Sequence, residues 1–137
     1  MNYWLVKSEP SVYSWTQLEE DGNVVWDGVR NFSARNHLRA MKKGDRVLFY
    51  HSNEGMAVMG VAIVSSEAYQ DPTDDSSTWS SVDLIPETRF NTPVLLKMIK
   101  TDSLLSQMQF VKQSRLSVSA VTSKEFDLIC ELGNSSS

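Results

Sequence analysis

The sequence is poor in cysteine and histidine and contains no long run of apolar residues. Its one cysteine, Cys130, cannot form an internal disulfide, and together with His37 and His51 it is too small a set for a four-ligand zinc site. A transmembrane helix is excluded because no stretch of about 18 apolar residues occurs, and the first residues lack the charged and apolar blocks of a secretory signal. We therefore expect a protein of a reducing, cytoplasmic compartment that holds no metal and does not contact membranes.

A length of 137 residues suits one domain and is short for two. Hydrophobic residues make up 41% and charged residues 22% of the chain, both near the averages of globular proteins, so wholesale disorder is not expected. The prediction is one monomeric domain over residues 1–133, followed by a frayed tail over residues 134–137.

The formal net charge of −4 conceals a separation of charge along the chain. Residues 26–52 hold six basic and two acidic residues, whereas residues 67–88 hold six acidic residues and no lysine or arginine. An acidic protein can therefore still present one positive face to a nucleic acid, although a solvated helix and a solvated loop would give the same pattern.

Apolar patterning and turn signals predict short strands alternating with helices. Ser14 with Gln17 begins one helix, and Thr122 with Glu125 begins another, which Gly133 ends. The expected strands are 3–7, 24–26, 46–51, 56–64 and 79–84, the expected helices are 14–20, 31–43, 102–108 and 122–132, residues 70–78 are expected to form a mobile loop, and residues 93–100 fit either a strand or a helix. One α+β domain containing a small, mostly antiparallel β-barrel with flanking helices accounts for this order.

The helix expected over residues 31–43 has two distinct faces. Ala34, Leu38 and Met41 recur at helical spacing and are expected to face the core. The basic residues recur on another face, where Arg35, Arg39 and Lys42 would meet solvent or a negatively charged partner.

The motifs of common enzyme classes are missing from the chain. It contains no glycine-rich phosphate loop, no Gly-x-Ser-x-Gly elbow and no cluster of metal ligands. His51 stands beside Ser52 after a strand, but no partner carboxylate or nucleophile accompanies it, so a structural histidine is the simpler interpretation. We therefore expect neither catalysis nor a cofactor.

Aromatic recognition of a flat ligand is a second class of function that the sequence permits. Trp26 precedes the turn-forming run Asp27-Gly28-Val29-Arg30-Asn31. A tryptophan ring beside backbone amides, an arginine and an asparagine could stack on a flat base and hydrogen-bond its edge. The same ring could instead cover one end of the barrel, and the residues alone leave both interpretations open.

Several ordered motifs make the sequence resemble the EVE domain family. They run from Tyr3 to about Leu132 and are Trp4-Leu5-Val6-Lys7-Ser8-Glu9-Pro10, Trp26-Asp27-Gly28-Val29-Arg30-Asn31, Ala34-Arg35-Asn36, Leu38-Arg39-Ala40-Met41-Lys42, Gly44-Asp45, Phe49-Tyr50-His51-Ser52 and Arg115-Leu116-Ser117-Val118-Ser119. The family usually has a proline where Ala120 stands, a difference that matters little for a pocket.

The resemblance implies a PUA-like barrel related to the YTH domain, and the binding of a modified base, with modified cytosine in DNA as the leading proposal. By motif matching, the base-binding residues would be Lys7, Ser8, Trp26, Gly28, Val29, Asn31, Tyr50, His51, Ser52, Trp79, Arg115 and Ser117, of which Trp79 matches most loosely. The phosphate-binding residues would be Arg30, Arg35, Arg39 and Lys42. Asp27 could instead pair with Arg30 or Arg115 in a purely architectural role.

Two other functions fit the same residues. One is a PUA-type module that binds an RNA end, a loop or a modified RNA base, and the other is a pocket for a small metabolite beside solvated arginines. All three functions need a concave aromatic site, so the sequence does not separate them.

Overall fold

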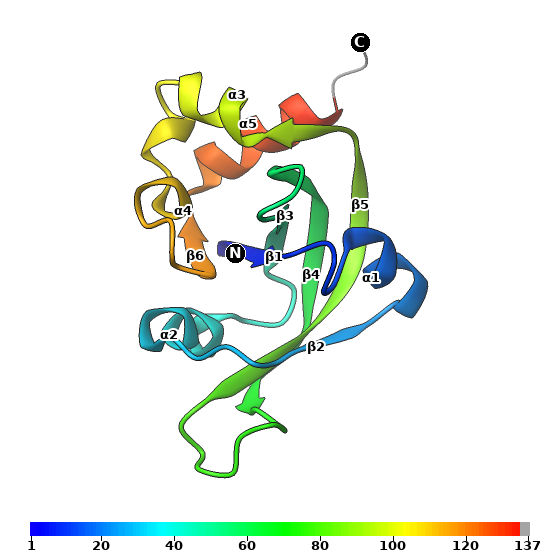
Figure 1. Ribbon diagram of the computed structural model, residues 1–137, viewed down its shortest axis with the longest axis vertical. Coiled ribbons are helices and arrows are strands. Elements are labelled where there is room, and N and C mark those ends of the chain that lie inside the picture. The colour runs from blue at the N-terminus through cyan, green and yellow to red at the C-terminus, as the bar shows by residue number, and fades with distance from the viewer. Residues whose placement is uncertain (135–137) are drawn as a thin grey trace.

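The computed structural model describes residues 1–134 as a mixed α+β fold built on one six-stranded sheet (Figure 1). The strands are β1 (Tyr3–Ser8), β2 (Val24–Trp26), β3 (Arg46–His51), β4 (Ala57–Gln70), β5 (Ser80–Leu95) and β6 (Val118–Val121). The helices are α1 (Trp15–Asp21), α2 (Phe32–Ala40), α3 (Leu96–Thr101), α4 (Gln109–Lys112) and α5 (Ser123–Asn134), with a 3₁₀ turn η1 (Leu105–Gln107). All five strands expected from the sequence are present, and β4 and β5 extend well beyond their predicted ends.

The strands follow the order β2-β5-β4-β3-β1-β6, with β1 and β3 parallel and every other pair antiparallel. Within residues 1–134 the edge strands β2 and β6 do not pair with each other, so the sheet is open and the expected closed barrel is not confirmed. Helix α2 packs against β6 on one side and against β4 and β5 on the other. Helix α2 thus occupies the side on which the edge strands β2 and β6 would have to meet to close a barrel.

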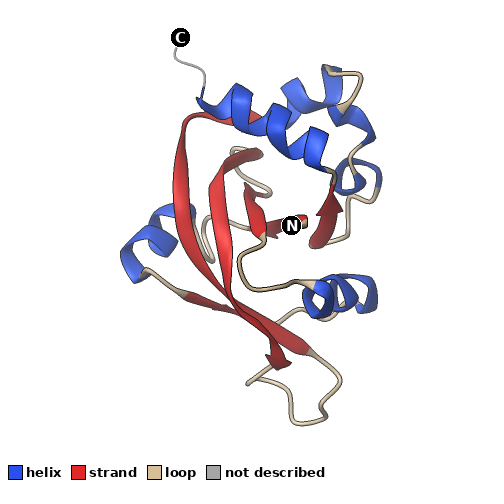
Figure 2. Ribbon diagram, turned by 180° about the vertical axis from the view of Figure 1, so that it is seen from behind, coloured by secondary structure: helices blue, strands red, loops and turns tan. Residues whose placement is uncertain are grey.

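Side chains on both faces of the central strands are buried, which explains their nearly continuous apolar sequences. Along β1, Trp4 and Val6 belong to one hydrophobic core and Leu5 to a second core on the other face of the sheet. The first core packs beneath α1 and α2, and the second lies beneath α3, α4 and α5, which gather at one end of the sheet (Figure 2). Strand β4 is buried on both faces in the same way, with Ala62 and Val64 in the first core and Val58 and Val61 in the second.

Helix α2 buries the stripe predicted for it but is shorter than expected. Ala34 and Leu38 are fully buried, and Met41 remains buried just beyond the last turn. The helix ends at Ala40 instead of continuing to residue 43, because the Asp45 carboxylate accepts the Lys42 N–H at 3.0 Å and also the indole N–H of Trp4 at 3.0 Å. These bonds hold the chain in a turn toward β3.

In the C-terminal part of the chain, the observed elements differ from the predicted ones at three boundaries. Residues 93–100 contain the end of β5 and most of α3, and the helix expected over residues 102–108 is reduced to the η1 turn. The Thr122 and Glu125 capping box forms as predicted, with N–H to side-chain distances of 2.9 and 3.2 Å. Helix α5 does not end at Gly133, and this glycine packs so closely on the Phe90 ring that a Cβ there would collide with it. The helix includes Asn134, and the rest of the predicted tail, residues 135–137, lies outside the described residues.

Candidate functional site

A cleft of about 540 Å³ opens where β1 ends, beside β2 and the turn that follows it. Its volume falls in the range of pockets that hold small ligands, and a nucleobase is smaller than the ligands that usually fill them. The cleft is lined by Lys7, Ser8, Glu9, Val12, Tyr13, Val24, Val25, Trp26, Asp27, Gly28, Val29, Arg30 and Ser117. Seven of these residues were predicted for the site from the sequence, and they come from three segments far apart in the chain.

Trp26 is the largest side chain of the cleft, and its ring is held from two sides. Phe49 contacts it edge to face at 5.6 Å between ring centroids, and Tyr13 does so at 6.3 Å. The side chain is 9% exposed, and its indole N–H has no hydrogen-bond partner among residues 1–134. A ring fixed in this way presents an aromatic wall and a free donor to a ligand without losing side-chain entropy on binding.

The polar groups at the end of β1 are already partly engaged. Ser8 donates its hydroxyl hydrogen to the backbone carbonyl of Tyr13 at 2.6 Å. The Lys7 ammonium donates to the carbonyl oxygen of Ser114 at 2.8 Å and lies 5.7 Å from the Phe110 ring. Burial lowers the pKa of Lys7. Both residues therefore shape the wall of the cleft.

The turn after Trp26 is anchored by one buried carboxylate. Gly28 has a φ of 76°, a left-handed conformation that glycine adopts without strain, and its N–H donates to Asp71 at 2.8 Å. Arg30 donates to the same oxygen at 3.0 Å, while Thr73 donates to the other oxygen through both its N–H and its hydroxyl, at 2.7 and 2.6 Å. The loop over residues 71–79 is thus tied to the rim of the cleft, and Arg30 pairs with Asp71 instead of Asp27.

These bonds set the ionisation of Asp71. Its burial disfavours the charged form, but the hydrogen bonds from Thr73, Gly28 and Arg30 outweigh that effect and lower the pKa from 3.8 to about 2. The carboxylate is therefore charged at neutral pH and accepts all four donors.

Asp71→Asn is expected to destabilise the protein by about 2 kcal/mol at neutral pH, because two of the donors would face an amide. Since the pKa is lower in the folded state, this contribution is present above about pH 4 and is lost as the pH falls toward about 2. Thermal unfolding of both proteins across this range checks the expectation, with Asp75→Asn in the exposed part of the loop as the control. A difference between Asp71→Asn and the parent that persisted unchanged at pH 2 would contradict it.

The structure places six of the twelve predicted base-binding residues outside the Trp26 cleft, namely Asn31, Tyr50, His51, Ser52, Trp79 and Arg115. The Asn31 side-chain oxygen accepts the Ala34 N–H at 2.9 Å and so caps α2, and His51 accepts the Trp15 N–H at 3.0 Å. Burial, together with the Arg89 charge, lowers the pKa of His51 and keeps it a neutral acceptor. Tyr50 and Ser52 line a smaller cleft of about 200 Å³ on the other side of Lys7.

A polar groove of about 350 Å³ is formed by the chain segments that continue from the walls of the cleft. Asn31 and Ser33 follow Arg30 on one side, and on the other the segment 112–116 precedes Ser117. The groove contains two exposed cations, Lys112 and the predicted Arg115, and no acidic residue. Lys112 was not predicted, because a single lysine in a short helix gives no signal in the sequence.

The predicted phosphate contacts hold the start of β5 while remaining at the surface. Arg35 and Arg39 each donate to the backbone carbonyl of Thr78 at 3.1 Å, and Arg39 also donates to the Ser80 hydroxyl at 2.9 Å. Lys42 extends into solvent. Several of the five N–H donors of each guanidinium are still unused, so phosphate contact is compatible with these bonds.

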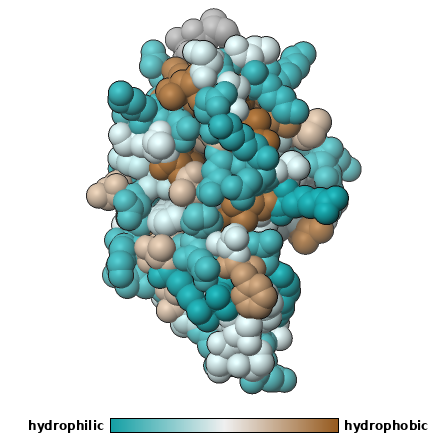
Figure 3. Space-filling view, turned by 90° about the vertical axis from the view of Figure 1, so that its left-hand side faces the viewer, coloured by the Kyte–Doolittle hydropathy of each residue, from teal (hydrophilic) through white to brown (hydrophobic). Residues whose placement is uncertain are grey.

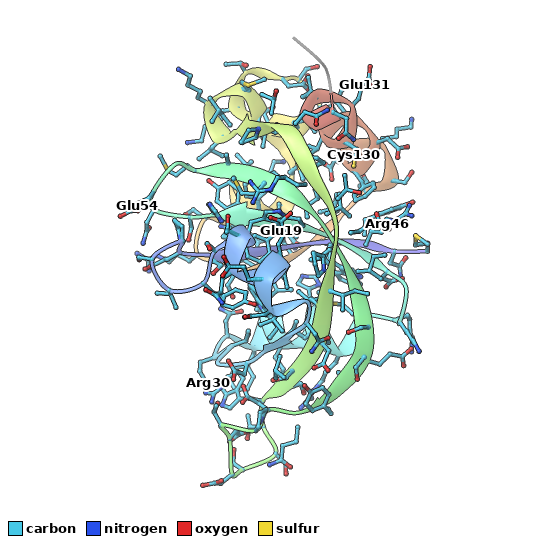
Figure 4. The ribbon with its side chains drawn as sticks, turned by 90° about the vertical axis from the view of Figure 1, so that its right-hand side faces the viewer. Glu19, Arg30, Arg46, Glu54, Cys130 and Glu131 are labelled. Atoms are coloured by element: carbon cyan, nitrogen blue, oxygen red, sulfur yellow. The ribbon has the colours of Figure 1, made fainter. Side chains whose placement is uncertain are left out.

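Trp79 belongs to a stack of side chains outside the cleft. The Arg30 guanidinium lies 5.6 Å from the centre of the Trp79 ring, which stacks on Phe32 at 4.9 Å, and Phe32 lies in turn beneath Arg35 at 4.8 Å. Figure 4 shows Arg30 beside the loop that joins β4 to β5, far from Cys130 at the opposite end of the molecule. Trp79 is therefore a rim residue, and Phe32 was missed because one exposed aromatic at a helix start carries no periodic signal.

The sequence also missed the apolar lining formed by Val12, Tyr13, Val24 and Val25. The alternation of β2 gave a signal for one of them, since Val24 is two residues from Trp26 and shares its face of the strand.

Within residues 1–134, no group of three or more His, Cys, Asp or Glu side chains is arranged to hold a metal ion. None of the helices in this part of the chain is long and apolar enough to cross a membrane.

Comparison with known proteins gives a consistent result along almost the whole chain. The family model described as "EVE domain" matches residues 2–132. Thymocyte nuclear protein 1 of Gallus gallus is 34% identical over 95% of this chain and 68% of its own length. Relatives of this name are called nuclear proteins, so they give no support to the cytoplasmic location expected from the single cysteine.

Solved structures share the fold closely. The NMR structure of a Rhodopseudomonas palustris protein is 47% identical, with a TM-score of 0.93 over 97% of this chain and 93% of that one. The crystal structure of human THYN1 protein in complex with 5-methylcytosine-containing DNA is 30% identical, with a TM-score of 0.91 and full coverage of both chains. A YTH domain from Zygosaccharomyces rouxii, 17% identical with a TM-score of 0.63 over 99% of this chain and 88% of that one, shares the fold at a greater distance.

Proposed function

The chain belongs to the EVE domain family, and on this premise we propose that it is a nucleic-acid-binding module that takes a modified base, preferably a modified cytosine in DNA, into the Trp26 cleft. The observation that carries the proposal is a tryptophan ring fixed in a cleft of about 540 Å³. The human relative solved with 5-methylcytosine-containing DNA supports the choice of ligand. The module would act as a monomer with a PUA-like fold, in which α2 stands where a barrel would close.

The lining of the cleft suits a base whose added group is apolar. A methyl group contributes only about 1 kcal/mol of apolar burial, so it is recognised only where water is excluded around it. Trp26 and Tyr13 provide aromatic surface, and Val12, Val24 and Val29 provide aliphatic surface. Lys7, Ser8, Gly28 and Ser117 would close the cleft around the base.

Two carboxylates in the same cleft favour cytosine over thymine. Glu9 and Asp27 line the cleft, and among residues 1–134 the Asp27 side chain has no hydrogen-bond partner. A carboxylate accepts a hydrogen bond from the exocyclic amino group of cytosine, which thymine replaces with a carbonyl oxygen. The unpaired Asp27 would therefore attract the first base and repel the second.

A binding screen tests the proposal. DNA oligonucleotides with one cytosine, 5-methylcytosine or 5-hydroxymethylcytosine, single- and double-stranded, are titrated with the protein beside RNA oligonucleotides of the same sequence. We expect 5-methylcytosine in DNA to bind at least about fivefold more tightly than cytosine, the factor that corresponds to one buried methyl group. Equal affinity for all bases would contradict base recognition, and a preference for RNA would establish the RNA-binding alternative.

The dependence on salt tests the contribution of phosphate contacts. If Arg35, Arg39 and Lys42 contact the phosphates of the nucleic acid, the logarithm of the affinity is expected to fall with the logarithm of salt concentration at a slope of about −2 to −3. Lys42→Glu is expected to weaken all oligonucleotides alike and to leave the preference among bases unchanged, whereas Lys97→Glu on α3 serves as the matched control. Binding that is insensitive to salt would indicate the small-metabolite pocket instead.

A further inference from the structure

Phe32 is unusual among the large apolar side chains because it is both exposed and immobilised. It is the first residue of α2 and is 60% exposed. Its ring nevertheless stacks on Trp79 at 4.9 Å and lies 4.8 Å from the Arg35 guanidinium. Burial does not explain this ring, and a stack of this kind holds it in a fixed direction at the surface.

The position of Phe32 relates it to the cleft. Arg30 lines the cleft and covers Trp79, so the stack begins at the rim and ends at Phe32. The neighbouring residues Asn31 and Ser33 line the polar groove that also holds Lys112 and Arg115. The surrounding face, which carries α2 in its lower half, is largely hydrophilic, with hydrophobic side chains in small separate groups (Figure 3). An exposed apolar ring with Arg35 over it, beside a groove that holds Lys112 and Arg115, suits a partner that is negatively charged outside and apolar inside.

We propose that Phe32 is a wedge that enters a DNA duplex and fills the space left by the base that moves into the Trp26 cleft. The inference rests on the proposed function and adds that the protein extracts its base from double-stranded DNA.

Duplex binding carries an energetic cost that such a group would offset. A base in a duplex must be unstacked and unpaired before it reaches a recessed cleft, at a cost of a few kcal/mol. Proteins that distort DNA offset this cost with apolar side chains inserted between base steps. A ring already fixed by Trp79 and Arg35 loses little entropy on insertion. Arg35 beside the ring and Lys112 in the adjoining groove would then neutralise the flanking phosphates.

The test compares Phe32→Ala with the parent on two probes, a short duplex and a single strand of the same sequence, each with one 5-methylcytosine. We expect about tenfold weaker binding of the duplex, the size of one lost stacking contact, and unchanged binding of the single strand. A mismatch opposite the modified base lowers the cost of unpairing and is expected to restore most of the lost affinity. Phe32→Leu, which keeps apolar bulk, should retain most duplex binding. The control Leu104→Ala removes another exposed apolar side chain, 37% exposed and beyond α3, and should behave as the parent.

Equal weakening of duplex and single strand would overturn the wedge and make Phe32 a simple stacking contact. Unchanged duplex binding by Phe32→Ala would overturn it as well. If the parent itself bound neither probe, the proposed function would fail, an outcome that is distinct from both.

Discussion

Trp26→Ala is expected to weaken binding of a 5-methylcytosine oligonucleotide by about ten- to a hundredfold. Stacking of one base on an aromatic side chain contributes about 1–3 kcal/mol, and Trp26 is the largest aromatic side chain that lines the cleft. The loss should be measured by titration at constant salt. It should fall more heavily on the modified base than on cytosine, because the apolar environment of the methyl group is lost together with the ring.

The experiment must separate an effect on binding from an effect on stability, since Trp26 also belongs to the hydrophobic core and contacts Phe49 there. Trp26→Phe keeps much of the apolar volume and should fold even where the alanine variant is strongly destabilised. Trp4→Phe is the matched control, because Trp4 lies in the same core and outside the cleft. If Trp26→Phe and Trp4→Phe bound the modified oligonucleotide equally well, the role assigned to Trp26 would be wrong.

Leu38→Ala is expected to lower the free energy of unfolding by about 2–5 kcal/mol. Leu38 is fully buried beneath α2, in the core that it shares with Trp4 and Val118. Removing its side chain would leave a cavity between the helix and the sheet, which rigid neighbours fill only in part. Denaturant titration measures the effect.

Arg39→Ala provides the comparison for Leu38, because it alters the neighbouring position on the exposed face of the same helix. Arg39→Ala should lower the free energy of unfolding by about 1 kcal/mol at most, the contribution of its hydrogen bonds to the start of β5. A larger loss for Arg39→Ala than for Leu38→Ala would contradict the orientation of α2.

Local signals in the sequence predicted the elements well where side chain and backbone interact within a few residues. Ser14 caps α1 by accepting the Gln17 N–H, and Thr122 and Glu125 cap α5 reciprocally. The apolar stripe of α2 likewise predicted which side chains are buried, since helical periodicity is fixed by backbone geometry.

Predictions failed where contacts between distant segments decide the outcome. Asp71 and Arg30 are 41 residues apart, so the anchor of the cleft turn could not be found from spacing. Gly133 has the pattern of a helix end, but its contact with Phe90 depends on how β5 and α5 pack. The openness of the sheet was also hidden, because it depends on where α2 lies relative to β6.

The site itself was predicted in part. Motif matching identified Trp26, Gly28 and Ser8, which do line one cleft. It also included Asn31, whose side-chain oxygen accepts the Ala34 N–H and so caps α2, as asparagine before a helix commonly does. The segment with Tyr13 was missed because its approach to β2 is a tertiary contact.

The most direct test of the central claim follows the tryptophan indole N–H signals by ¹⁵N NMR during titration with a 5-methylcytosine oligonucleotide. The indole of Trp26 lines the cleft and has no partner among residues 1–134, whereas the indole N–H of Trp4 is bonded to Asp45 outside it. We expect the Trp26 signal to shift most, the Trp79 signal at the rim to shift less, and the Trp4 signal to stay in place. An oligonucleotide that binds while the Trp26 signal remains unmoved would contradict base binding at Trp26.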